Sequence, residues 1–471
     1  MGTLRGRIWS DGEKPLPARV HVIASSGEHF APGRVERTPE TGERSFPDAL
    51  LKRGPGEPFF YCDGTFEMDV HGGQTDVIVE RGTEWERATV VIDVPARGAI
   101  DVDVRLRRWA SLLDTTWRAG NTHVHYDHRE DRPEERMRSE PPAEGLDVIV
   151  VSHVERERYP YASNRIPVGR QRLDTAHVVD VGEEIRHNLT GFGVGYGHLL
   201  LFKLTAPVLP ISRGMLRGPG EPDYPPLSDG CDAAHAQGGL AFAYHGGTGM
   251  EVPVAAMRGK LDAMNLNDPW WLEAEYGVWY RLLNAGVRLP ASTGSDWQLS
   301  SNGRVYADAG ASFSYESWLG GLCAGRSLAT NGPLLRLDGA ARATLEWQSD
   351  VPLDRVELVA DGEVIASAAD PQVPRGSLAG AAPAGAMWIA GRCYSRIRDS
   401  YGQARWAHTS PVWLCDRASG PRAKDAGRSF VDEIDRSLQW LRTKARFSSP
   451  GDRARVIALF REARGNFAGL G

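Results

Sequence analysis

Hydrophobic and polar positions alternate over the first part of the chain. From Gly6 to about Arg108 the alternating runs are short, as in Thr65–Val70 and Ile100–Leu106, and turn residues separate them. A period of two is typical of strands with one buried face. No long amphipathic helix interrupts the runs, so residues 1–108 are predicted to form an antiparallel β-sandwich domain.

After Trp109 the pattern changes to alternating helices and strands. A helical stretch leads through a small residue into a hydrophobic strand that ends on polar residues, as in Asp147–His153, Leu240–His245 and Val287–Ser292. Parallel strands joined by helices place their C-terminal ends on one side of a domain. We therefore expect residues 109–333 to form one α/β domain with polar side chains gathered at the strand ends.

A second β domain and a helical tail are predicted to follow. Strand patterns around the Asp361-Gly362 hairpin turn assign residues 334–418 to a C-terminal antiparallel β-sandwich. In residues 419–471, Phe430, Ile434, Leu438 and Leu441 recur at helical spacing. This tail is expected to pack back on the body of the protein.

Length and composition fit a multidomain globular protein. The chain has 471 residues, and its formal net charge of -6 comes without any Lys/Arg-rich tract. We therefore expect neither nucleic acid nor a membrane surface as a partner. Five cysteines are scattered without a Cys-x-x-Cys pair, and the N-terminus lacks the hydrophobic core of a signal peptide. Both features predict a cytoplasmic protein with reduced thiols.

Candidate chemistry begins in the range Asn121–His128, which holds three histidines and an aspartate. In a strand, His123 and His125 project from the same face, and imidazole is a ligand for zinc, iron and manganese. Asp127 and His128 could each be a further ligand or could line the edge of the pocket. Seven residues at or next to strand ends are predicted to converge on one metal site: His123, His125, His153, Glu184, His198, His245 and Asp296.

Other residues of these types have structural interpretations. His177 falls at a strand start and His235 in a helix, so both are expected to be structural, whereas His187 could face the site or solvent. An aromatic cluster at helical spacing is predicted to be mainly core, with some of it available to a substrate pocket. It comprises Trp270, Trp271, Tyr276, Trp279 and Tyr280.

Residues 120–333 resemble the polymerase-and-histidinol-phosphatase (PHP) superfamily of metallohydrolases. The matching motifs are His123-Val124-His125, Ser152-His153, Gly182-Glu183-Glu184, Gly197-His198, His245 and Ser295-Asp296. The wider chain is similar to the carbaryl-hydrolase-like (CehA/McbA) branch, through Tyr61–Phe66, Arg304, Thr330–Pro333 and Ala407–Pro411. The resemblance implies a distorted (β/α)7 barrel between two accessory β domains, and a metal-dependent hydrolase.

Two positions depart from the family pattern. Ser152 stands where the family usually has aspartate, and Gln298 where it often has histidine. We therefore expect one or two divalent ions (zinc, manganese or iron), with Glu184 bridging if there are two. By this interpretation His123, His125, Glu184 and Asp296 hold one ion, and His153, His198 and His245 lie at or near the second.

The predicted activity is hydrolysis of an ester, amide or carbamate bond in a small molecule by metal-activated water. His153 and His198 are candidates for proton transfer, and Arg304 for gripping an oxyanion or a substrate carboxylate. A surface ion pair is the alternative for Arg304. Two other functions stay open: a phosphoesterase that uses the same metals, and a non-catalytic protein that binds a glycan or a partner through a degenerate barrel. Nothing in the sequence indicates the oligomeric state.

Overall fold

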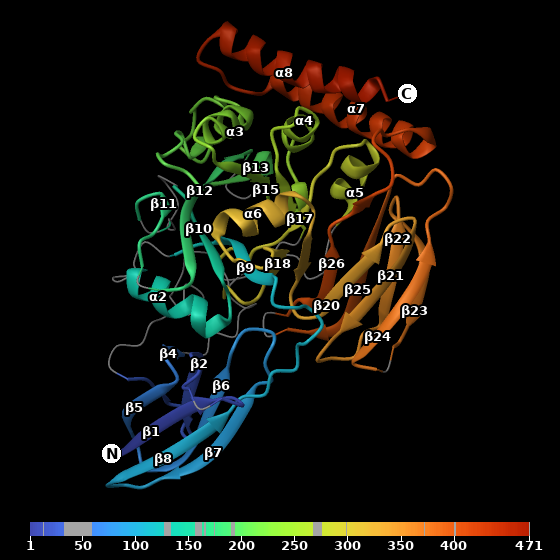
Figure 1. Cartoon of the computed structure of the whole chain (residues 1–471). Coiled ribbons are helices and arrows are strands. Elements are labelled where there is room, and N and C mark those ends of the chain that lie inside the picture. Colours follow the sequence, from blue (N-terminus) through green and yellow to red (C-terminus); the bar gives the residue numbers. More distant parts are fainter. Residues whose placement is uncertain are drawn as a thin grey trace.

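The computed structural model has a mixed α/β fold rich in sheet, as the sequence predicts (Figure 1). It describes the chain except residues 13, 33–58, 127–132, 156–162, 164–165, 174, 190–193, 267–275, 298, 372, 400–401 and 471. Among the described residues, no helix combines the length and hydrophobicity that crossing a bilayer requires.

Two small sheets form the N-terminal part of the chain. One has the order β5-β1-β8, and the other joins β2, β3, β4, β6 and β7. Their strands are β1 (Gly2–Trp9), β2 (Ala18–Ala24), β3 (His29–Phe30), β4 (Phe60–Cys62), β5 (Thr65–Val70), β6 (Gly73–Glu80), β7 (Ala88–Val94) and β8 (Ala99–Arg105). Alternate residues of both sheets share one hydrophobic cluster that includes Leu4, Val20 and Val102. β1 and β8 pair in parallel, so the expectation of a purely antiparallel domain is wrong at this pair.

The central strands form a continuous path of hydrogen-bonded neighbours, in the order β17-β16-β15-β13-β12-β10-β9. They are β9 (Trp117–Val124), β10 (Val148–His153), β12 (Val178–Asn188), β13 (Val194–Phe202), β15 (Leu240–Ala243), β16 (Ala263–Asn265) and β17 (Ala291–Ser292). Around them lie α2 (Pro133–Glu144), α3 (Leu227–His235), α4 (Val252–Met257), α5 (Gly277–Asn284) and α6 (Tyr315–Cys323) (Figure 1).

Two features of this path differ from a simple alternation of parallel strands and helices. β13 runs antiparallel to both β12 and β15, and the residues described between β12 and β13 contain no helix. The segment after β17 also returns to β9, because the N–H of Asp296 donates to His123 O at 2.9 Å and the N–H of His125 donates to Asp296 O at 3.0 Å. The segment that follows β17 is therefore joined to β9 by backbone hydrogen bonds.

The C-terminal strands continue the same sheet. β18 (Arg304–Asp308) pairs with β9, β19 (Ser327–Thr330) pairs with β18, and β26 (Ala404–Thr409) pairs with β19. β25 (Trp388–Arg398), β22 (Arg355–Ala360) and β23 (Glu363–Ala369) follow in order. A separate antiparallel sheet of β20 (Leu334–Gly339), β21 (Arg342–Gln348) and β24 (Arg375–Ala381) shares a hydrophobic cluster with them. The sequence did not predict the link through β19 and β26.

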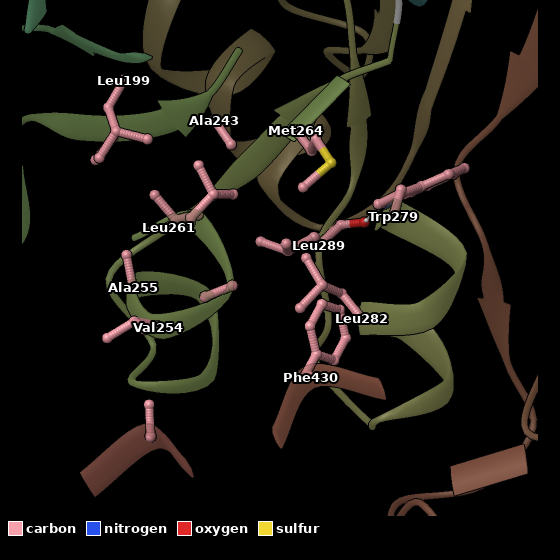
Figure 2. Packing of buried hydrophobic residues seen from close by; sticks show 14 of the residues in the cluster. Leu199, Ala243, Val254, Ala255, Leu261, Met264, Trp279, Leu282, Leu289 and Phe430 are labelled. Carbon is pink, nitrogen blue, oxygen red and sulfur yellow. Dashed lines mark hydrogen bonds between the residues drawn. The ribbon is translucent and has the colours of Figure 1, made fainter. Parts of the chain in front are cut away.

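The tail is helical, as predicted, and covers one end of the central part (Figure 1). α7 (Gly420–Thr443) and α8 (Pro450–Ala468) pack on each other and against α4 and α5. The hydrophobic face of α7 is buried and belongs to the largest core cluster. Figure 2 shows Phe430 beside Leu282 of α5, and its ring centroid lies 4.6 Å from that of Phe467.

This packing predicts a large stability loss for Phe430→Ala. The side chain is fully buried, so its removal leaves a cavity and is expected to lower the free energy of unfolding by about 3–5 kcal/mol. Val364→Ala is the control, since Val364 is 44% exposed and its truncation is expected to cost less than about 0.5 kcal/mol. Urea unfolding followed by tryptophan fluorescence measures both. Equal losses for the two variants would contradict the docking of the tail.

Candidate metal centre

Four predicted ligands meet: His123 and His125 at the end of β9, Glu184 inside β12, and Asp296 in the segment after β17. His123 Nε2 and His125 Nε2 are 2.8 Å apart, and each faces the Glu184 carboxylate, with Oε2 at 3.4 and 3.0 Å respectively. Asp296 Oδ1 lies 3.0 Å from His125 Nε2 and 3.9 Å from His123 Nε2. All four residues are buried, and one ligand atom from each lies within 4.8 Å of the others. This first group could hold a metal ion.

Glu184 also belongs to a second group, with His198 and His245. Its Oε1 atom lies 2.9 Å from His198 Nδ1 and 4.0 Å from His245 Nε2. The two oxygens of one carboxylate thus face different sets of histidines, Oε2 toward the first group and Oε1 toward the second. Glu184 is at the centre of the arrangement, in the place expected of a bridging carboxylate.

Hydrogen bonds hold two of the rings in the tautomer that a metal requires. His125 Nδ1–H donates to the Ser152 carbonyl at 2.7 Å, so Nε2 is the ring atom that faces the first group. His198 Nε2–H donates to Asn188 Oδ1 at 2.6 Å, which leaves the Nδ1 lone pair directed at Glu184. A ligand histidine usually donates its other ring N–H in this way. The carbonyl of Ser152 therefore orients His125, although its side chain departs from the family pattern.

The Asp296 segment is fixed to β9 by Asn121. The Asn121 side-chain amide donates to Ser295 Oγ at 2.8 Å and to Gly303 O at 3.0 Å, while its Oδ1 accepts from the His123 backbone N–H at 2.9 Å. One side chain thus aligns the strand that carries His123 and the segment that carries Asp296.

Backbone strain accompanies the site. His245 and Asp296 have φ values of 51° and 55°, a left-handed conformation that is unfavourable for residues other than glycine. At Gly294 a Cβ would lie 2.4 Å from the Cβ of His123, so the segment can approach β9 only with glycine at this position. These departures place ligand side chains where regular strands would not.

The histidines have unequal proton affinities. Burial lowers the pKa of His125, but its hydrogen bonds to Asp296 and Glu184 outweigh burial and raise it to about 9. Burial and then the neighbouring His125 ring lower the pKa of His123. Burial and then the charge of Arg186 lower the pKa of His198 to about 3. At neutral pH one proton therefore lies in the first group, on His125.

The residues fit a divalent cation. The four side chains of the first group, His123, His125, Glu184 and Asp296, are buried, and one nitrogen or oxygen atom of each lies within 4.8 Å of the others. Two carboxylates and two imidazoles gathered in one buried site are stabilised by a positive charge at their centre. The donors are imidazole and carboxylate without a thiolate, which suits zinc, manganese or iron.

His153 and Arg304 are not part of either group. His153 Nε2 accepts from the Ile166 N–H at 3.1 Å. Arg304 is buried on the face of β18 that it shares with Tyr306, and its Nη2 donates to Glu144 O at 2.9 Å. It borders a cavity of about 310 Å³ between Arg81 of the N-terminal part and the central strands. This placement argues against the predicted contact of Arg304 with substrate, and Arg304 is not a surface ion pair either.

The remaining sequence candidates have structural contacts. His177 Nδ1 donates to Leu146 O at 2.7 Å, and His235 Nε2 lies 2.9 Å from Asp262 Oδ2. His187 turns away from the site and donates from Nε2 to Asp223 Oδ1 at 2.8 Å. Tyr276, Trp279 and Tyr280 pack in the core around His408. Asp127, His128, Trp270, Trp271 and Gln298 lie outside the described residues.

Sequence reasoning missed several residues that contact the site. Asn188 orients His198, and the Trp297 ring stacks on His125 with centroids 4.5 Å apart. Arg186 is absent from the residues predicted to form the site, and its Nη2 lies 3.5 Å from Glu184 Oε1. For Arg186 and Asn188 a signal existed, because they follow Glu184 at intervals of two in a strand.

Comparison with known proteins gives no relative. No protein-family model matches the chain, and no curated protein matches it. The candidate site therefore stands on its own geometry.

The pKa of His125 predicts that metal affinity rises with pH. Below about pH 9 His125 carries a proton that must leave before Nε2 can coordinate a cation, whereas His198 and His123 are already neutral at pH 7. Between about pH 6.5 and 8.5 the affinity should rise about tenfold per pH unit, with close to one proton released per ion. Titration calorimetry in buffers of different ionisation enthalpy measures this release. Binding that is independent of pH in this range would contradict the assigned proton.

Proposed function

We propose that this chain is a metal-dependent hydrolase of the PHP type that cleaves an ester, amide or carbamate bond of a small molecule. The observation that carries the proposal is the position of Glu184, whose two oxygens each face a separate set of buried histidines. The seven-strand path, from which the segment after β17 returns to β9, supports a (β/α)7 barrel as the fold that presents this site. The order of the motifs along the chain is the one that the resemblance implies.

A bound divalent ion would supply a coordinated water of lowered pKa and would polarise the substrate carbonyl. His123, His125, Glu184 and Asp296 would hold it. In hydrolysis the water oxygen bonds to the carbonyl carbon, the bond to the alcohol or amine breaks, and one proton of the water ends on the leaving group.

His245 is the best placed residue to move that proton. Its side chain is 14% exposed, whereas that of His198 is 5% exposed and is tied to Asn188 and Glu184. His245 Nε2 lies 4.0 Å from Glu184 Oε1, which is within reach through one water. We therefore assign the proton transfer to His245, and not to His153 or His198 as the sequence predicts.

The two alternatives receive less support. A phosphoesterase usually presents several cations to its substrate, and among the described residues Arg186 is the arginine whose guanidinium contacts the ligand groups, because Arg304 points elsewhere. A protein that only binds a partner would not need these seven strands, the strained backbone at His245 and Asp296, or a buried site in which the ligand atoms face one another. Both observations favour hydrolysis of a carbonyl compound.

The test compares Glu184→Gln with Glu183→Gln. Protein purified without chelator is expected to carry a divalent ion and to hydrolyse aryl esters or carbamates, and Glu184→Gln should reduce metal affinity and turnover by about 100-fold or more. Glu183 is the matched control, because its Oε2 accepts the Val208 N–H at 2.9 Å and a glutamine oxygen can do the same.

The measurements are metal content by mass spectrometry and turnover of ester, carbamate and phosphate-ester panels before and after chelation. Unchanged metal content and turnover in Glu184→Gln would sink the proposal. Chelator-sensitive turnover confined to phosphate esters would establish the phosphoesterase instead.

A further inference from the structure

Arg186 lies beside the carboxylate at the centre of the site. It follows Glu184 by two positions in β12, so both side chains leave the same face of the strand, and its partner across the strand pair is His198. The residue is only 5% exposed. Its Nη2 atom lies 3.5 Å from Glu184 Oε1, the oxygen that faces His198 and His245.

The guanidinium of Arg186 has donors that the described residues do not satisfy. Nε and Nη1 are both buried, and neither has a hydrogen-bond partner. Arg213 in β14 (Ser212–Gly214) is also buried, and only its Nη2 lacks a partner among the described residues, since its Nε donates to Pro225 O at 2.7 Å and its Nη1 to Ile211 O at 3.4 Å. A buried charged donor without a partner is costly, so the open donors of Arg186 point to an acceptor that binds in the site.

Charge limits how many metal ions the site can take. With neutral histidines, the carboxylates of Glu184 and Asp296 and the guanidinium of Arg186 leave one negative charge. One divalent ion turns this into a single positive charge, which an anionic oxygen neutralises. Two divalent ions would leave three positive charges in a buried site, with the second ion directly beside the guanidinium, and like charges at that distance repel strongly.

We propose that Arg186 takes the place of a second metal ion at Glu184 Oε1, so that the centre works with one divalent ion. The hydrogen-bond donors of Arg186 that have no partner in the described part of the chain then bind the negatively charged oxygen that develops on the substrate. As water adds to the carbonyl carbon, the C=O electron pair moves onto that oxygen, and it returns when the bond to the leaving group breaks. A donor preorganised for this charge accelerates the step. The substrate role of Arg186 rests on the proposed hydrolase function. The number of metal ions does not.

Metal counting tests the first part. Wild-type protein dialysed against zinc or manganese is expected to saturate at one equivalent. Arg186→Met should take up a second, weaker ion between Glu184, His198 and His245, and adding His198→Ala should remove it again. Arg186→Lys keeps the charge and should stay at one equivalent. Two tight equivalents in the wild type, or one equivalent in Arg186→Met, would overturn the replacement of a metal by Arg186.

Anion binding tests the second part without turnover. Inorganic phosphate is titrated into cobalt-loaded protein and followed by the visible spectrum of the ion. Arg186→Met is expected to weaken phosphate binding by about 10–100-fold, and Arg186→Lys by less, because a hydrogen bond to a charged group is lost or only altered. Arg213→Met controls for the loss of a buried arginine and should bind phosphate as the wild type does. Equal affinity in wild type and Arg186→Met would overturn the anion role.

Turnover separates this inference from the proposed function. With a substrate that the wild type hydrolyses, Arg186→Met should lower kcat by about 100–1000-fold with little change in KM. The reason is that Arg186 contacts the substrate oxygen only as its negative charge develops. A protein that binds one ion, and binds phosphate through Arg186, but hydrolyses no ester, amide or carbamate would refute the proposed hydrolase and leave the assignment of Arg186 intact.

Discussion

The site depends on one buried carboxylate that is surrounded by nitrogen atoms. Glu184 is 1% exposed and faces four histidines and an arginine. Burial favours its neutral form, yet the charge of Arg186 and the histidine contacts outweigh burial and hold its pKa well below the ordinary range. An ionised carboxylate in such a place is stable only while positive charge lies close to both oxygens.

The surrounding structure brings that charge to the two oxygens in different ways. On the Oε2 side, His123, His125 and Asp296 form a compact set of ligand atoms that could hold a cation. Asn121 and the hydrogen bonds between β9 and the Asp296 segment hold the backbone of these residues in place. On the Oε1 side the strand itself supplies a guanidinium. In the proposed function this asymmetry assigns the cation to one oxygen of the carboxylate, and the proton and the developing charge to the side of the other.

Much of this was accessible from the sequence because strand geometry is local. The period of two places His123 beside His125, and the polar ends of successive strands pointed correctly to Glu184, His198, His245 and Asp296. The direction of each strand, and the part of the strand that reaches the site, were harder to predict from the sequence. β13 runs antiparallel to β12, and His198 reaches the site from the middle of its strand and not from its end.

Other features depend on tertiary contacts that a linear pattern does not contain. Arg304 follows Asp296 closely in sequence but lies on a face of β18 that packs toward the N-terminal sheets. His153 ends its strand at the expected place, yet the Ile166 backbone holds its ring. The union of central and C-terminal strands through β19 and β26 likewise joins segments far apart in the chain.

An anomalous difference map at the absorption edge of the bound metal would locate the ion in the site. We expect one strong peak, about 2.0–2.2 Å from His123 Nε2, His125 Nε2 and an oxygen of Glu184, with the Arg186 guanidinium at the other oxygen. A peak elsewhere in the molecule, or no peak in protein that retains its activity, would contradict this expectation.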